Sequence, residues 1–553
     1  MSARVIFAAA FAGTVWACWC GVAAGADTAG GDAAGAGVAA GAGAAYTADW
    51  PSLQKHADPR WFGDDKFGIY FHWGVYAVPA FGTEWYPHNM YRKGSAEHKY
   101  HLEKFGPLST FGYKDFIPMF KAEKFDPDAW AELFEKAGAR FAGPVAEHAD
   151  GFAMWDCRLN RWNAARMGPK RDLVGELEKA IRKRGLKFVT TFHHQWLWGW
   201  YPTQDKTTDC SNSEYAGLYG PAYPLTAFNF ANPQPMPTPE FCEMWENKVK
   251  EVIDRYQPDL IWFDGRLVII GEQYRKDLMA YYYNQARRWG REVTITYKDG
   301  YERGTGILDL ERGRMARVTR YRWLNDDSID WRSWGYIQNG DYKSTDRLVD
   351  GLVDIVSKNG NLLLNIGPKA DGTIPQAIRE RLLGMGAWLK VNGEAIYATR
   401  PFQVFGEGPT EVKEGHFSEQ HIKEFTAQDI RFTTRGDVLY AICLDWPGEK
   451  LTIKTLAKPC PLARGEVAAV TLLGHDGRLE WAQDQAGLTI KLPPAKPCEH
   501  AFAFKITGLT GLAWDDAIWP GPDGALTLDA GRAELHGSKL NLHTEAGRQM
   551  IAH

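Results

Sequence analysis

Short apolar runs alternate with longer segments of helical period between residues 60 and 400, and this alternation restricts the fold more than any other feature. The apolar runs predict buried strands at Phe67–Phe71, Arg140–Val145, Lys187–Phe192, Leu260–Phe263 and Val293–Tyr297, and within Asn359–Pro368. The other segments predict helices at about Pro127–Ala137, Lys170–Arg184, Pro239–Tyr256, Tyr274–Trp289, Asp346–Lys358 and Ile378–Asn392. Strands that alternate with helices form parallel sheets, because each helix returns the chain to the same edge. The alternation therefore predicts an α/β fold, a parallel (β/α)8 barrel with loop insertions.

One of these strands runs directly into a carboxylate. Leu260–Phe263 is followed by Asp264 and Gly265. Burying a carboxylate at a strand end is costly unless another group pairs with it or uses it. An Asp in this position often begins a turn, whereas parallel barrels carry their catalytic side chains at the C-terminal ends of their strands. On this strand alone both interpretations of Asp264 stay open.

Other strand ends combine histidines with aromatic rings. His72 closes the first strand and Glu84-Trp85 follows soon after. His148 follows the second strand, and His193-His194 end the third. The chain contains 23 Trp, and a cleft with ring faces and polar groups suits a sugar, which has an apolar face and hydroxyl edges. Each single His could instead be a hydrogen-bonded core residue.

Glu311 is a second candidate carboxylate. It lies between apolar residues and beside Arg312 and Arg314. A surface salt bridge is the commoner role for such a residue. If Glu311 were an acid catalyst, a nearby Asp264 charge would raise its pKa and the two arginines would oppose that shift.

The chain changes character after residue 398. Short strand-like runs between turns, at Ile430–Thr433, Val438–Cys443, Leu451–Thr455, Val467–Leu473 and Leu488–Leu492, predict a β-sandwich over residues 399–508. We expect the (β/α)8-like domain, which holds the candidate catalytic residues, over residues 46–398, directly before the sandwich. Residues 509–553 hold too little apolar sequence for a core and resemble the start of a further, truncated module.

The N-terminus predicts export. An apolar run from Val5 to about Ala24, ending in small residues, indicates a signal peptide over 1–26, with a transmembrane anchor as the rival interpretation. The Gly/Ala-rich stretch 27–45 predicts a flexible linker. We therefore expect a secreted or periplasmic protein with no membrane span after cleavage of the signal.

Charge and cysteine content exclude several classes of partner. A net charge of -4 provides no basic surface for nucleic acid. The cysteines form no CxxC pair, so a metal cluster is not expected. Adjacent His193 and His194 on a strand would face opposite ways and could not readily share one ion. We expect neither a cofactor nor a metal.

Six motifs together resemble a known family. They are Phe67-Gly68-Ile69-Tyr70-Phe71-His72-Trp73-Gly74, Glu84-Trp85-Tyr86, His148 with Asp150-Gly151-Phe152, Gly168 to Gly175, Leu260 to Asp264, and Ser357 to Pro368. In order and in type they resemble the α-L-fucosidases of glycoside hydrolase family 29, and the resemblance extends from about residue 50 into the sandwich.

The resemblance implies a distorted (β/α)8 barrel followed by a β-sandwich, and retaining hydrolysis without a metal. It implies that Asp264 is the nucleophile and Glu311 the acid/base, with His72, Glu84, Trp85, His148 and Trp262 lining the fucose pocket. Retaining hydrolysis needs two carboxyl groups about 5 Å apart, which neighbouring strand-to-helix loops can supply.

The sequence departs from the family pattern at two positions. Ala149 stands where the family usually has a second His, and His193 or His194 could replace that contact. An Arg that often precedes the acid/base segment is absent, and Lys298 is the nearest candidate. Both changes concern sugar recognition.

We therefore expect an exported retaining exo-α-L-fucosidase that acts on fucosylated oligosaccharides or polysaccharides. The changed residue at Ala149 keeps an α-L-galactosidase or related glycosidase as an alternative. A catalytically inactive glycan-binding protein is the alternative from another class, and an intact Asp264 with a candidate Glu311 argues against it.

Overall fold

The computed structural model describes residues 44–222, 232–514, 541–545 and 548–552. The predicted signal peptide and nearly all of the predicted linker lie outside these residues. Ala44–Trp514 forms one compact unit, and the antiparallel hairpin of β17 (Asn541–Glu545) and β18 (Arg548–Ala552) belongs to a separate one. None of the helices in the described ranges has the length and apolarity that a membrane crossing requires.

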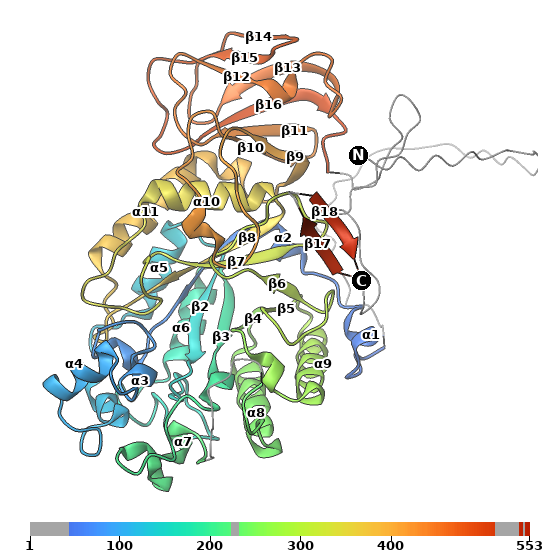
Figure 1. The fold of residues 1–553 in the computed structure, drawn as a ribbon. Coiled ribbons are helices and arrows are strands. Elements are labelled where there is room, and N and C mark those ends of the chain that lie inside the picture. Colours follow the sequence, from blue (N-terminus) through green and yellow to red (C-terminus); the bar gives the residue numbers. More distant parts are fainter. Residues whose placement is uncertain (1–43, 223–231, 515–540, 546–547, 553) are drawn as a thin grey trace, which may run out of the picture. The chain divides into compact units, whose positions relative to one another are not determined.

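Eight parallel strands close into a barrel, which confirms the predicted fold (Figure 1). They are β1 (Phe67–Phe71), β2 (Phe141–Glu147), β3 (Lys187–Phe192), β4 (Leu260–Phe263), β5 (Thr294–Tyr297), β6 (Ile307–Asp309), β7 (Trp323–Ser328) and β8 (Gly360–Ile366). Because β8 pairs with both β7 and β1, this sheet has no free edge. All strands end at the same mouth, so the side chains that follow them gather there.

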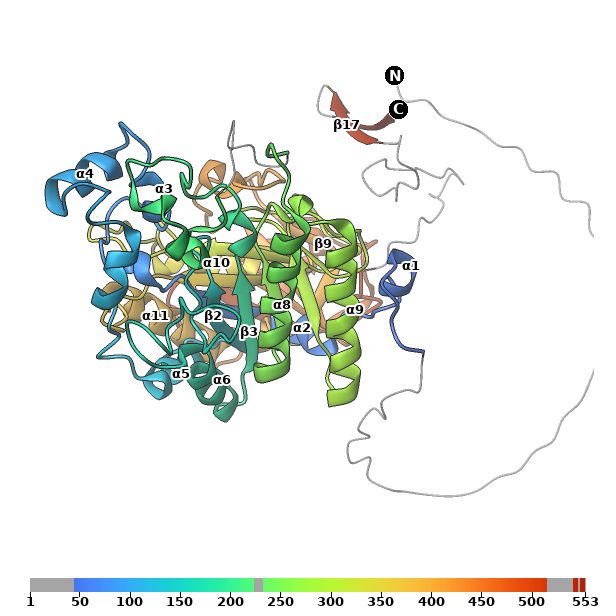
Figure 2. The ribbon, with the colours of Figure 1, turned by 90° about the horizontal axis from the view of Figure 1, so that it is seen from below.

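Six long helices lie outside the strands (Figure 2). They are α5 (Pro127–Lys136), α6 (Leu173–Lys183), α8 (Pro239–Tyr256), α9 (Glu272–Trp289), α10 (Thr345–Ser357) and α11 (Gln376–Asn392). Side chains of Asp126, Asp172, Thr238 and Ser344 each accept a hydrogen bond from a backbone N–H in the first turn of the helix that follows. These caps satisfy N–H groups that have no partner within the helix, and they explain why four helices begin close to the predicted positions.

Two strands of the barrel have no counterpart among the predicted elements. β6 has only three residues, too few to show a period. β7 has the sequence WLNDDS, and all six of its residues are buried. Its Asp327 carboxylate pairs with Lys343 at 2.5 Å, and the side-chain amide of Asn325 donates to the carbonyl of Leu310 at 2.9 Å. A strand stabilised by buried polar partners does not show the apolar pattern by which strands are recognised in a sequence.

The C-terminal domain is a β-sandwich, as predicted. One antiparallel sheet has the order β13-β16-β11-β10-β9 and the other β12-β15-β14. Their bounds are β9 (Arg400–Glu407), β10 (Ile430–Arg435), β11 (Val438–Cys443), β12 (Lys450–Ile453), β13 (Arg464–Leu472), β14 (Trp481–Asp484), β15 (Gly487–Lys491) and β16 (Phe502–Thr510). Buried residues from both sheets, among them Phe432 and Ile490, form one core.

The sandwich packs on the barrel through α10 and α11 (Figure 1). The Arg431 guanidinium of β10 pairs with Asp354 of α10 at 2.7 Å, and both side chains are buried. The indole N–H of Trp388 on α11 donates to the carbonyl of Ala501 at 2.7 Å. These buried polar contacts fix the sandwich against the barrel.

Candidate active site

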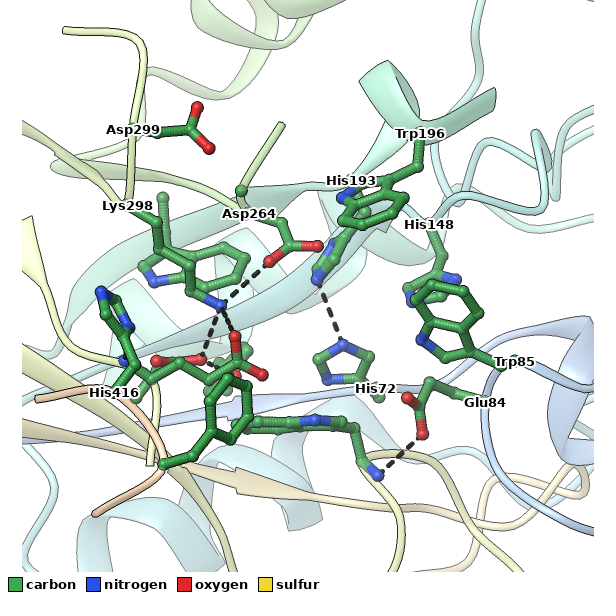
Figure 3. A pocket seen from close by; sticks show the side chains of 17 residues that line it. His72, Glu84, Trp85, His148, His193, Trp196, Asp264, Lys298, Asp299 and His416 are labelled. Carbon is green, nitrogen blue, oxygen red and sulfur yellow. Dashed lines mark hydrogen bonds and ion pairs between the residues drawn. The ribbon is translucent and has the colours of Figure 1, made fainter. Parts of the chain in front are cut away.

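A cavity of about 580 Å³ lies at the C-terminal mouth of the barrel (Figure 3). Most of its polar lining residues follow the ends of consecutive strands. They are His72 after β1, His148 after β2, His193 after β3, Asp264 after β4, Lys298 after β5 and Glu311 after β6, with Asp326 inside β7. All predicted site residues except His194 line this cavity.

Asp264 and Glu311 meet at one lysine. Lys298 Nζ lies 2.9 Å from Asp264 Oδ1 and 2.7 Å from Glu311 Oε2 (Figure 3). Two contacts of 2.9 and 2.7 Å to one nitrogen place the two oxygens within about 5.6 Å of each other, close to the spacing of retaining glycosidases. The loop after β4 and the loop after β6 thus bring two carboxyl groups to one point.

Glu311 is set up to hold a proton. Burial raises the pKa of Glu311 to about 7, the charges of Asp326 and Asp264 act in the same direction, and Lys298 opposes them. A carboxyl group with this pKa is largely protonated below neutral pH, which an acid catalyst requires. Of the two carboxyl groups, Glu311 is the one whose raised pKa suits an acid.

The two arginines beside Glu311 do not line the cavity. The Arg312 guanidinium pairs with Glu419 at 3.2 Å, and that of Arg314 lies 3.9 Å from Asp327. Both guanidinium groups are thus paired elsewhere, and the charge that opposes the pKa shift of Glu311 is that of Lys298. The surface-salt-bridge interpretation of Glu311 is wrong, because its partner is Lys298 inside the cavity.

Lys298 carries its charge among acids. Burial alone would lower the pKa of Lys298, but Asp264, Asp326 and Glu311 raise it well above its usual value. The ammonium also lies over the ring of Trp262, 4.7 Å from the centroid. Lys298 therefore stays charged and holds the carboxylates in place.

Three neutral histidines form the opposite wall. His72 Nδ1 lies 2.8 Å from the side-chain oxygen of Asn365, so it donates there, and its Nε2 lies 3.2 Å from Nε2 of His193. Burial lowers the pKa of His72 to about 4 and those of His148 and His193 well below the usual value. Neutral imidazoles both donate and accept, which suits sugar hydroxyls.

The same three histidines could also bind a metal ion. One nitrogen from each lies within 4.8 Å of the others, and all three residues are buried. Neutral imidazoles are common metal ligands. The expectation that no metal takes part stays a prediction.

Glu84 and the tryptophans complete the wall. The Glu84 carboxylate accepts from the backbone N–H of Trp334 at 2.9 Å and from the hydroxyl of Ser333 at 3.2 Å, and burial raises its pKa. Trp85 packs against Trp196, with ring centroids 5.4 Å apart. Trp85 and Trp196 give the apolar faces expected of a sugar pocket, and Glu84 gives it a polar group.

His194 does not reach this cavity, so the prediction that it binds substrate is wrong. Its ring stacks on Trp245, and its Nε2 lies 3.1 Å from the carbonyl oxygen of Trp245, between the barrel and α8. His193 and His194 point in opposite directions, and only His193 faces the mouth. Ala149 is buried and does not line the cavity, whereas the His193 ring lies beside that of His148, with centroids 4.7 Å apart.

Sequence reasoning missed several lining residues, namely Tyr70, Trp196, Asp299, Asp326, Trp334, His416 and Phe417. Tyr70 lies in the motif that ends at Gly74, and Trp196 follows the strand end at His193-His194. Asp326 lies in the unrecognised strand β7, where it accepts a hydrogen bond from the Tyr70 hydroxyl at 3.2 Å. His416 and Phe417 come from the C-terminal domain, and nothing in their local sequence indicates a place in a barrel mouth.

Comparison with known proteins identifies a family for both domains. A sequence model described as "Alpha-L-fucosidase" matches residues 36–394, and one described as "Alpha-L-fucosidase C-terminal domain" matches residues 423–507. The tissue alpha-L-fucosidase of Rattus norvegicus is 33% identical over 483 residues, 84% of this chain and 92% of the rat protein. That of Homo sapiens is 32% identical, with the same coverage.

A solved structure is similar over the same length. The crystal structure of Thermotoga maritima alpha-fucosidase in complex with fucose shares 32% identity and a TM-score of 0.65, and the match covers 84% of this chain and 100% of that one. The barrel family's model thus spans more than half of the present sequence, and a second model matches within the sandwich. The chain belongs to the α-L-fucosidases of glycoside hydrolase family 29.

Proposed function

We propose that this α-L-fucosidase is a retaining exo-glycosidase that forms a covalent glycosyl intermediate on Asp264. The observation that carries the proposal is the pair Asp264 and Glu311, held within about 5.6 Å around Lys298, with the pKa of Glu311 raised to about 7. The related Thermotoga maritima enzyme has been solved with fucose and with a mechanism-based inhibitor, which supports the same site and chemistry.

The mechanism follows from these positions. Glu311 gives its proton to the glycosidic oxygen while Asp264 Oδ attacks the anomeric carbon, so the bond to the leaving group breaks as the ester forms. Glu311, now ionised, takes a proton from water, which attacks the same carbon and releases Asp264. Two displacements return the original configuration. The neutral histidines hold the fucose hydroxyls, and the cavity accommodates a terminal residue.

A small panel of aryl glycosides tests this proposal. We expect hydrolysis of aryl α-L-fucoside, with α-L-fucose as the first product seen by proton NMR before mutarotation. First appearance of the β-anomer would mean inversion and would contradict the role of Asp264 as nucleophile.

The sugar preference has a specific alternative. α-L-Galactose differs from fucose by a hydroxyl on carbon 6, and Ala149 stands where the family usually has a second His. The walls formed by Trp85, Trp196 and Trp262 favour a methyl group. We expect kcat/KM for aryl α-L-fucoside to exceed that for aryl α-L-galactoside by roughly a hundredfold, the discrimination an apolar pocket gives against an added hydroxyl. Equal values would favour the galactosidase.

Lys298 should control the pH dependence. Lys298 lowers the pKa of Glu311, so Lys298→Met raises that pKa. The active form carries a protonated Glu311, and activity is lost as pH rises through its pKa. The alkaline limb of kcat/KM should therefore move to higher pH in Lys298→Met, with a reduced maximum. Lys298→Arg keeps the charge and is the matched control. If the alkaline limb of kcat/KM stayed at the same pH in Lys298→Met, Lys298 would not influence the pKa of the acid.

We also propose that the protein is exported, to the exterior or the periplasm, on the basis of the apolar N-terminal run. N-terminal sequencing of protein from the producing cells should begin close to Ala26 rather than at Met1.

A further inference from the structure

A short segment of the C-terminal domain lies along the loop that carries the acid. This segment, Glu414–Glu419, belongs to the connection between β9 and β10. The backbone N–H of Phe417 donates to the carbonyl of Glu311 at 2.8 Å, and the backbone N–H of Glu311 donates to His416 Nδ1 at 3.1 Å. The segment therefore forms hydrogen bonds with both the backbone N–H and the backbone carbonyl of Glu311.

A buried ion network fixes this segment to the barrel. The Glu419 carboxylate pairs with Lys343 at 2.5 Å and with Arg312 at 3.2 Å. Lys343 also pairs with Asp327 of β7 at 2.5 Å. All four side chains are largely or fully buried, so breaking one pair would leave a charge without its partner. These ion pairs make Glu414–Glu419 a fixed part of the barrel mouth.

Phe417 stands out within this segment. Its neighbours Ser418 and Glu419 are buried, whereas Phe417 is 49% exposed and lines the cavity. Its φ of 56° lies in the left-handed region, which a bulky side chain rarely adopts and glycine adopts without strain. An apolar ring held in a strained conformation at the rim of a pocket indicates a contact with ligand.

The position of Phe417 identifies what it would contact. Glu311 gives its proton to the glycosidic oxygen, so the leaving group lies on the Glu311 side of the cavity. His416 lies beside Lys298 on that side, across Asp264 from His148 and Trp85 (Figure 3). Phe417 follows His416 directly and lines the same cavity.

We propose that Glu414–Glu419 forms the leaving-group subsite, with Phe417 packing on the ring to which fucose is attached. This inference rests on the proposed retaining mechanism. The segment lies between the two ranges that match family models, 36–394 and 423–507. The C-terminal domain thereby takes part in choosing which glycan is cleaved.

Two substrates distinguish an effect on this subsite from an effect on the fucose pocket. α-L-Fucosyl fluoride has a single atom as leaving group. A disaccharide in which α-L-fucose is attached to galactose instead presents the galactose ring to Phe417. In Phe417→Gly we expect the ratio of kcat/KM for the disaccharide to kcat/KM for the fluoride to fall about tenfold, the scale of one lost aromatic contact. Glycine suits the left-handed backbone, so the melting temperature should not fall.

Tyr321→Ala is the matched control, since Tyr321 is 42% exposed but does not line the cavity, and it should keep the wild-type ratio. An active wild type with an unaltered ratio in Phe417→Gly would refute the subsite alone. A wild type that cannot hydrolyse the fluoride would refute the proposed mechanism and the subsite with it.

Discussion

Replacing Asp264 by glycine is expected to lower kcat for an aryl α-L-fucoside by at least about a thousandfold, because the first displacement loses its attacking group. Azide can enter the space left by the carboxylate and attack the anomeric carbon from the same face. Added azide should therefore restore turnover and yield β-L-fucosyl azide. Steady-state rates with and without azide, with NMR of the product, measure both effects.

Asp299 offers a matched control for this variant, because it also lines the cavity. Its carboxylate accepts from the backbone N–H groups of Arg266 at 2.6 Å and Val268 at 3.1 Å, which marks a structural role. Asp299→Asn should lower kcat for the aryl α-L-fucoside by less than about tenfold, and azide should not restore its activity. A larger loss in Asp299→Asn than in Asp264→Gly would move the nucleophile to Asp299.

Replacing Glu311 by alanine should give a loss that depends on the leaving group. A sugar leaving group needs a proton, so we expect a loss of about a thousandfold on a disaccharide and a much smaller loss on an aryl fucoside whose phenol is a good leaving group. Wild-type activity should fall as pH rises above about 7, the pKa of Glu311, and this alkaline limb should be absent in Glu311→Ala. Rates across pH on both substrates measure these effects.

Asp326 is the rival acid, because it lies 3.5 Å from Lys298 and lines the same cavity. Asp326→Asn should retain the alkaline limb, shifted to lower pH, since the Asp326 charge raises the pKa of Glu311. Loss of the limb in Asp326→Asn, with its retention in Glu311→Ala, would assign the acid to Asp326.

The sequence predicts the parts of this molecule whose stability is local. β4 is a short apolar run, and its position before Asp264 suffices to place that carboxylate at the mouth. The capped helices can also be recognised in the sequence, because a capping residue such as Asp126 or Thr238 directly precedes the first turn. The predicted contacts of His72, Glu84 and Trp85 with the cavity rest on the family motifs, and the structure places all three there.

The remaining parts depend on distant partners. β7 is a strand because Lys343 neutralises Asp327 and Asn325 bonds to the preceding loop, and none of this can be read from WLNDDS. The direction of His194 depends on Trp245 of α8. The pKa of Glu311 depends on burial, on Lys298 and on Asp326, and the adjacent arginines in the sequence indicate none of these.

The segment Glu414–Glu419 also bears on how this enzyme can be divided or recombined. A chain cut at residue 398 would retain the barrel sequence but lose the backbone partners of Glu311 and Glu419, one of the two carboxylates that pair with Lys343. Exchanging the sandwich for that of a relative would exchange part of the catalytic mouth as well. The two domains are separate in architecture but constitute one enzymatic unit, which must be transplanted whole.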